Sequence, residues 1–338
     1  MSKIAIRIVS LIVAVFLGLL LSQEHTLGAP EPKTYTFKAV TFVPVSNPNV
    51  KNFRQWSEEV QKASNGQIVV KLLGGPEVVP MFDQHDAVGK GVVDLNFTSS
   101  GYYLKQLPEA RCLTISTLTP QQERKVGFLD FMRELHAKKK NVFVIGRQII
   151  SDLEQFVLWT NIEVKNIQTD LKGAKFRTSG STYVELYKSL GVSGITMRWS
   201  DVYTAVERGL IQGFSVPVSR FAAEKYYEVV KYGISPGFWS NNSVLLMNLD
   251  KWNSLPKNLQ QIMLDVQERL EPEFRAYIDS VDAKAYKEAK EGGLKIIKLP
   301  PDQTKWLTDV AYAGLWKQVK AGSSPENYAK LRKMLLGE

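Results

Sequence analysis

Hydrophobic positions in the first half of the chain switch repeatedly between a spacing of two and a spacing of three to four residues. Residues 35–42 alternate between apolar and polar side chains, as a strand does. Asn47 and Pro48 then open a stretch whose apolar side chains share one helical face: Val50, Phe53, Trp56 and Val60. The pattern continues with a strand at 67–73, a short helix at 83–88 and strands at 92–97 and 141–145. This β-α-β alternation predicts parallel sheets with helices on both faces.

The second half repeats the alternation with new segments. Strands are predicted at 174–178, 194–197 and 213–216, and helices at 182–190, 200–209 and 222–230. About 309 residues follow a short leader, which is enough for two lobes of ordinary domain size. We therefore expect two α/β lobes in series.

A third group of elements connects these lobes. The apolar strand at 243–248 is expected to return to the first lobe, and residues 257–291 have a helical pattern. At 1.5 Å per residue that helix would run about 50 Å, longer than one lobe, so we expect it to span both. Pro272 should kink or break it near Leu270. A strand at 295–299 and two helices between 302 and 336 complete the pattern.

The first 29 residues have the three parts of a secretory signal. Lys3 and Arg7 precede an apolar run at 8–21, and a short polar stretch ends at Gly28 and Ala29. The run is shorter than the roughly 18 residues expected of a membrane span, although an uncleaved anchor is the alternative. We expect an exported protein that is cleaved near Ala29.

Charge and cysteine content limit the classes of partner. The chain has 43 Lys and Arg against 34 Asp and Glu, a formal net charge of +9, and a basic surface favours the approach of anions. The basic residues are scattered, with the only tight cluster at 138–140, and no recognition motif is present, so no nucleic-acid partner is expected. Cys112 is the one cysteine and lies in an apolar run, which favours a buried core residue over a nucleophile.

Residues for catalysis or metal binding are sparse. His25 belongs to the leader, while His85 and His136 are far apart in sequence and lack metal-ligand spacing. No carboxylates have the spacing of an acid/base pair, and Asp201 is expected in the first turn of a helix. An exported hydrolase using Ser181 would lack a base near its nucleophile. We therefore expect a protein that is not an enzyme and that uses no cofactor or metal.

Arg177 is the most informative single residue. The strand pattern at 174–178 places it near a carboxyl end, where open α/β sheets bind their ligands. Its guanidinium is a planar fork of donors that suits a carboxylate or a phosphate. From position alone, a purely structural role also remains open.

Two segments around this arginine carry a family resemblance. Residues 170–180 read DLKGAKFRTSG and residues 199–213 read WSDVYTAVERGLIQG. With this two-lobe pattern and leader, the chain resembles the extracytoplasmic solute receptors of tripartite ATP-independent periplasmic (TRAP) transporters. The likeness covers essentially the whole mature chain and includes GVVD at 91–94, KYYEV at 225–229 and WNSLPKNL at 252–259.

The resemblance implies a two-lobed periplasmic binding protein fold, with hinge strands and a long helix spanning both lobes. The first lobe would cover residues 30–154, completed by about 243–282. The second would cover 155–242, completed by about 283–338. In that family the arginine matching Arg177 forms a salt bridge with the ligand's carboxylate, and the lobes close over it.

The resemblance also implies partners and a location. The protein would work as a monomer in the periplasm and deliver an organic anion to a permease with small and large membrane subunits. Transport would be driven by an ion gradient. A ligand-sensing subunit with the same fold is the alternative.

Departures from the family pattern point to the ligand's body. Sialic-acid-type members carry a second arginine before position 170, and residues 155–161 (QFVLWTN) have none. Aromatic and aliphatic residues take the place of polar ones, which favours a monocarboxylate with an apolar or aromatic body. A C4-dicarboxylate or a 2-oxo or hydroxy acid stays open, and these aromatics could instead be ordinary core.

Position in the resemblance selects the other candidate ligand-binding residues. Several follow the carboxyl end of a strand, where clefts collect ligands, and Trp199 has a competing role as a packing residue. With Arg177, the set comprises Phe42, Glu77, Ser99, Tyr102, Trp199, Phe214, Val216, Phe238 and Trp239.

Overall fold

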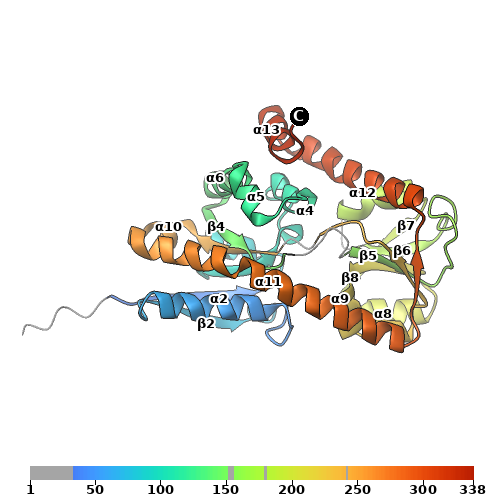
Figure 1. The fold of residues 1–338 in the computed structure, drawn as a ribbon, viewed down its shortest axis with the longest axis horizontal. Helices are drawn as coiled ribbons and strands as arrows, with labels where there is room; N and C mark the ends of the chain where they lie inside the picture. The colour runs from blue at the N-terminus through green and yellow to red at the C-terminus, as the bar shows by residue number, and fades with distance from the viewer. Residues whose placement is uncertain (1–32, 151–155, 179–180, 241–242) are drawn as a thin grey trace, which may run out of the picture. The chain divides into compact units, whose positions relative to one another are not determined.

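Two mixed β-sheets organise the chain in a computed structural model (Figure 1). The structure describes residues 33–150, 156–178, 181–240 and 243–338. The predicted leader and its cleavage site lie outside these residues. Both sheets belong to one compact unit, Tyr35–Glu338.

The first sheet has the strand order β2-β1-β3-β10-β4. Its strands are β1 (Tyr35–Thr41), β2 (Ile68–Gly74), β3 (Leu95–Ser99), β4 (Val142–Arg147) and β10 (Ser243–Asn248). β1 runs parallel to β2 and β3, whereas β10 enters between β3 and β4 and is antiparallel to both. The late strand therefore joins the first sheet as expected, but the sheet is mixed and the prediction of a purely parallel sheet is wrong.

The second sheet has the order β11-β9-β5-β8-β6-β7. Its strands are β5 (Phe156–Thr160), β6 (Lys175–Thr178), β7 (Ser193–Thr196), β8 (Gly213–Pro217), β9 (Tyr232–Ser235) and β11 (Lys295–Lys298). β6 is parallel to β7 and β8, while β5 is antiparallel to β8 and β9. Strands β5 and β9 were not predicted, and β5 makes this sheet mixed as well.

Amphipathic helices cover the sheets. In α2 (Val50–Ala63), the predicted apolar stripe of Val50, Phe53, Trp56 and Val60 is buried. Other helices next to the first sheet are α3 (Gln84–Gly89), α6 (Phe128–Lys140) and α10 (Leu249–Asn253). The second sheet is accompanied by α7 (Val184–Ser189), α8 (Trp199–Glu207) and α9 (Val218–Ala223). Asp201 lies in the first turn of α8, as predicted, where the helix dipole favours its charge.

The predicted helix at 222–230 is wrong. α9 ends at Ala223, and a separate short turn, η4 (Tyr226–Glu228), follows. Between them Lys225 has a φ of 52°, in the left-handed region that helices do not use. The apolar spacing continued across this residue, so the pattern alone did not reveal the interruption.

A single long helix, α11 (Lys257–Glu291), passes along both halves and packs against α2, β4 and α9 (Figure 1). Pro272 lies inside it, and the helix runs across this residue without a break, contrary to one predicted outcome. Proline removes one backbone hydrogen bond, so tertiary packing must hold the helix together here.

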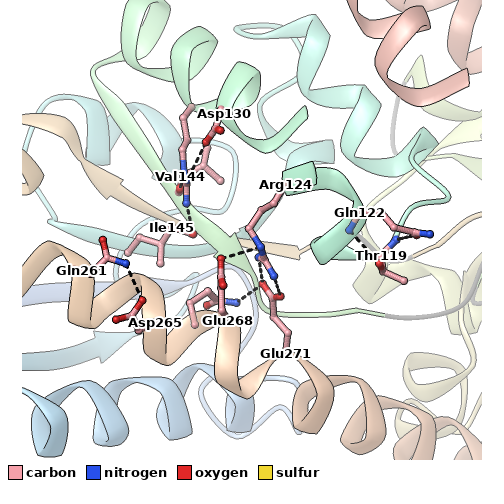
Figure 2. A network of polar contacts seen from close by, with 12 residues as sticks. Thr119, Gln122, Arg124, Asp130, Val144, Ile145, Gln261, Asp265, Glu268 and Glu271 are labelled. Atoms are coloured by element: carbon pink, nitrogen blue, oxygen red, sulfur yellow. Dashed lines mark hydrogen bonds and ion pairs between the residues drawn. The ribbon is translucent and has the colours of Figure 1, made fainter. Parts of the chain in front are cut away.

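Ion pairs next to Pro272 supply part of that support. The Nε of Arg124 lies 2.9 Å from Oε1 of Glu268, and its Nη1 donates to Oε1 of Glu271 at 2.9 Å (Figure 2). Arg124 belongs to α5 (Pro120–Lys125), so these contacts attach α11 to the first half on the N-terminal side of the proline.

Two helices end the chain, as predicted. α12 (Pro301–Gly322) contacts the short helices η2 (Pro108–Arg111) and α4 (Cys112–Ile115), and it also contacts α7. α13 (Pro325–Leu336) packs on α6. Among the residues that the structure describes, none of these helices is both long and apolar enough to cross a membrane.

Candidate functional site

Arg177 is the third residue of β6 and lies close to the strand's carboxyl end. Only 5% of it is exposed, and its Nε donates to the backbone oxygen of Met197 at 3.3 Å. Its guanidinium carbon lies 3.7 Å from the ring centroid of Trp199. Burial lowers the pKa of Arg177, but arginine keeps its charge at neutral pH. The site therefore contains a buried cation that lies over an indole ring.

No acidic side chain among the described residues forms an ion pair with Arg177. After burial, the ionisable groups that act on its pKa are Tyr183, Arg220, Tyr102 and Tyr187. Of these only Arg220 is charged at neutral pH, and it repels Arg177. Taking a charge out of water without a partner costs free energy, so this environment favours an anion beside the guanidinium.

Arg220 is a site residue that the sequence reasoning missed. It lies on α9, and its guanidinium carbon is 4.2 Å from the same Trp199 ring. Its Nε also pairs with Oε1 of Glu224 at 2.7 Å. The available signal was its place soon after the strand at 213–217, but nothing in the local pattern linked it to Arg177.

Trp199 is the first residue of α8, and its ring contacts the guanidinium groups of both arginines. Its ring meets Phe214 edge-on at a centroid distance of 6.1 Å, and Phe214 itself is fully buried in β8. Cation–π contacts of this kind are worth about 0.5–2 kcal/mol. The packing role and the site role predicted for Trp199 are thus compatible, because the ring packs on the core and orients Arg177.

Tyr102 brings the first sheet to this site. It lies in η1 (Ser100–Tyr102), directly after β3, and its ring contacts Phe42 at 5.6 Å and Phe82 at 5.3 Å. Burial raises the pKa of Tyr102, and the positive charges of Arg220 and Arg177 partly offset that rise. The structure therefore places Tyr102 within electrostatic reach of Arg177, with Phe42 in contact with the tyrosine.

The predicted residues Trp239 and Phe238 are buried in the hydrophobic cluster that also contains Tyr183. Trp239 meets Tyr183 at a ring distance of 5.2 Å and Phe238 at 4.8 Å. Tyr183 in turn donates to the backbone oxygen of Ser215 at 3.4 Å and acts on Arg177. Trp239 is therefore connected to the arginine through one tyrosine.

The remaining candidates are placed by contacts with other residues. Val216 is buried in β8 within the same hydrophobic cluster as Phe214. Ser99 ends β3 and pairs in register with Ser243. Glu77 is exposed, and the Gly75 backbone N–H that it accepts at 2.6 Å lowers the pKa of its carboxyl group. Its visible contact thus stabilises a turn.

The two histidines among the described residues lie together, although they are distant in sequence. His85 and His136 have ring centroids 6.0 Å apart, with Tyr103 in contact with both. Burial lowers the pKa of His85 to about 3 and that of His136 to about 4, so both are neutral. In the described part of the chain no three His, Cys, Asp or Glu side chains gather to hold a metal ion.

Cys112 is fully buried in the core, as the sequence predicted. Burial also raises the pKa of its thiol. Because the thiolate is the reactive form, this cysteine is inert.

Comparison with known proteins places this arrangement in a family. Residues 39–320 match the family model described as "DctP: Bacterial extracellular solute-binding protein, family 7". A monocarboxylate 2-oxoacid-binding periplasmic protein of Nostoc sp. (strain PCC 7120) is 28% identical over 254 residues, which are 71% of this chain and 67% of that protein.

Solved structures show the same fold. A TRAP periplasmic solute-binding protein from Desulfovibrio salexigens, with bound orotic acid, has a TM-score of 0.77 at 18% identity, covering 89% of this chain and 97% of that one. An extracytoplasmic solute receptor of Bordetella pertussis binding pyroglutamic acid has a TM-score of 0.74 at 17% identity, covering 89% and 99%. The two sheets and the long helix thus form the two-lobed fold of these receptors, and the chain belongs to family 7 of the bacterial extracellular solute-binding proteins.

Proposed function

We propose that this protein is the receptor of a TRAP transporter and that it binds an organic monocarboxylate through Arg177. The observation that carries the proposal is a guanidinium, 95% buried, with no acidic partner among the described residues. A bound carboxylate would supply the missing counter-charge. Because binding alone accounts for the site, we propose a receptor without turnover.

The geometry of Arg177 favours a carboxylate. Its Nε is used by Met197, so the two terminal nitrogens remain for the two oxygens of one carboxylate. Trp199 stacks on the guanidinium and limits its rotation. A pre-oriented fork loses less freedom on binding, which raises affinity.

The charge balance favours a single negative charge. Arg177 and Arg220 contribute two positive charges, and Glu224 pairs with Arg220. Tyr102 and Tyr183 are neutral because burial raises the pKa of each phenol. The net charge of this group is therefore matched by a monoanion.

The relatives support an organic acid. Of the three proteins compared above, one is a monocarboxylate 2-oxoacid-binding protein, one has bound orotic acid and one binds pyroglutamic acid. The buried aromatic residues near Arg177 are consistent with an apolar body, although Phe214 and Val216 also serve as core.

The fold supports capture between lobes. Tyr102 comes from the first sheet and Arg177 from the second, so a bound anion would contact both. We propose that the lobes follow the boundaries expected above and close on the ligand. We further propose export to the periplasm, cleavage near Ala29 and delivery, by a monomer, to the small and large permease subunits.

A ligand screen tests the proposal. Thermal unfolding of the purified protein is measured with a panel of organic acids, sugars and cations. An acid at 100 times its dissociation constant should add about 2.7 kcal/mol of stability. Stabilisation by sugars or cations alone would overturn the carboxylate proposal.

Calorimetry of Arg177→Met then tests the anchor. A charge-assisted hydrogen bond contributes about 1.5–3 kcal/mol, so affinity for the acid found in the screen should fall about 10- to 150-fold. The matched control is Arg198→Met. Arg198 is exposed and directly precedes Trp199 in the sequence, and its replacement should leave affinity unchanged. Equal binding by Arg177→Met and wild type would contradict the assignment.

A further inference from the structure

The three most deeply buried tryptophans differ in how their indole N–H groups are used. Trp56, Trp159 and Trp239 are each less than 2% exposed. The indole N–H of Trp56 donates to the backbone oxygen of Met263 at 3.3 Å, and that of Trp159 donates to Val216 at 2.8 Å. The indole N–H of Trp239 has no acceptor among the residues that the structure describes.

Unpartnered donors of this kind need an explanation. Buried polar groups in folded proteins are nearly always hydrogen-bonded, because an unmade bond forfeits the hydration that was lost on burial. The hydroxyl oxygens of Ser215 and Ser240 are also buried, and no described residue is their hydrogen-bond partner. Each of these polar atoms lies in a residue that is otherwise buried in the core.

Tyr183 links Trp239 and Ser215 to the anion site. The ring of Tyr183 contacts Trp239 at 5.2 Å, and its hydroxyl reaches the backbone of Ser215. The same tyrosine acts on Arg177, and Tyr187 donates to the Arg177 backbone oxygen at 2.9 Å. Arg177, a charged donor, and Trp239, an uncharged donor, are therefore both close to one tyrosine.

We propose that Trp239 is a specificity-determining residue whose indole N–H donates to an uncharged oxygen of the ligand, beyond the carboxylate that Arg177 binds. The ligand class is then a monocarboxylate that carries a carbonyl or hydroxyl oxygen on its body. Ser215 assists, since its hydroxyl can donate or accept. This inference rests on the proposed function, because it assumes that Arg177 anchors a carboxylate.

Indole N–H donation makes a specific demand on the ligand. Trp can donate but cannot accept, so it favours an acceptor oxygen and gains nothing from a methylene at the same place. A site built to make such a bond discriminates against the analogue that lacks it, because the donor is then left unpaired. The quantity to measure is therefore the ratio of affinities for two acids of similar size, one with the additional oxygen and one without it.

Calorimetric titration of wild type and Trp239→Phe uses three matched pairs of probes. These are butyrate and 2-oxobutyrate, pentanoate and 4-oxopentanoate, and 3-phenylpropionate and phenylpyruvate. In at least one pair the wild type should bind the oxygenated acid about tenfold more tightly. In Trp239→Phe that ratio should fall to about threefold or less, while affinity for the plain acid is unchanged.

Two further measurements separate recognition from packing. In the ¹H–¹⁵N spectrum the indole resonance that is missing from Trp239→Phe should move downfield with the oxygenated acid and stay in place with the plain acid. Trp252→Phe removes a buried indole from the first sheet's side and should leave every ratio unchanged.

The outcomes distinguish this inference from the proposed function. If Trp239→Phe lowers the affinity for both acids of a pair equally, Trp239 makes only an apolar contact with the ligand, and the inference alone is overturned. An unchanged ratio in Trp239→Phe would also overturn the inference alone. It would indicate that the indole N–H donates to an internal water and not to the ligand. Binding of none of the six acids by the wild type would overturn the proposed function, and this inference with it.

Discussion

Each sheet contains a buried arginine near the carboxyl end of a strand, but the two arginines differ in their ionic partners. Arg147 is the last residue of β4 and is 6% exposed, while Arg177 lies near the end of β6 and is 5% exposed. Arg147 donates through Nε to Oε2 of Glu123 at 2.8 Å and through Nη1 to the backbone oxygen of Leu113 at 2.9 Å. Its Nη2 forms an ion pair with the same carboxylate.

No carboxylate among the described residues compensates the charge of Arg177. One backbone oxygen accepts from its Nε, and an indole ring stacks on its guanidinium. The difference shows that burial of an arginine does not identify its role. The decisive property is whether the protein itself supplies the counter-charge, as it does for Arg147, or leaves it to a ligand, as we propose for Arg177.

Breaking the compensated pair should have the largest effect. Arg147→Met leaves the Glu123 carboxylate buried without a partner, and such losses cost about 3–5 kcal/mol of stability. Urea denaturation measures this change. The double variant Arg147→Met/Glu123→Gln removes both charges and should recover much of the loss. Equal destabilisation of the single and double variants would show that charge compensation is not the cause.

Acid should destabilise the fold through two buried histidines in the first half of the chain, His85 and His136. The unfolded chain protonates its histidines near pH 6.5, whereas folded His136 does so near pH 4 and His85 near pH 3. Their contribution is thus complete above about pH 6.5 and is lost as the pH falls. The loss is about 1.4 kcal/mol per pH unit for each histidine. Urea midpoints between pH 7 and pH 4.5 measure it, and His85→Phe should flatten the dependence. Parallel curves for His85→Phe and wild type would count against the histidines.

Arg177→Met should have the smallest effect on stability. Removal of a buried charge that has no acidic partner relieves a desolvation cost, so stability should change by less than about 1 kcal/mol or rise. Urea denaturation without added acid checks this, with Arg147→Met as the contrasting variant. A loss of several kcal/mol would show that Arg177 is structural, and the comparison between the two arginines would fail.

Local patterns predicted the elements that depend on near neighbours. The strand at 174–178, the helix that contains Asp201 and the stripe of α2 all appear where the spacing placed them. The missed β5 shows the limit of the method. Its residues, Phe156–Thr160, were interpreted as lining a ligand pocket, whereas Val157 and Trp159 belong to a hydrophobic core cluster. A short apolar run has the same composition in both roles.

Directions and partners of strands depended on distant parts of the chain. β10 is antiparallel to β3 and β4, although the β-α-β pattern suggested parallel pairing throughout. The helix pattern around Lys225 likewise gave no sign of a left-handed residue. In both cases the local spacing was satisfied by more than one arrangement.

By itself the sequence determined an α/β chain, the family resemblance and an arginine at a strand's end, because these depend on periodicity and on contiguous motifs. Only the tertiary structure decided that Glu123 reaches Arg147 while no described acid reaches Arg177. It also brought Arg220 to Trp199 and Trp239 to Tyr183. Charge compensation and hydrogen-bond satisfaction are sums over neighbours in space, and the order of strands in the sheets determines which residues those neighbours are.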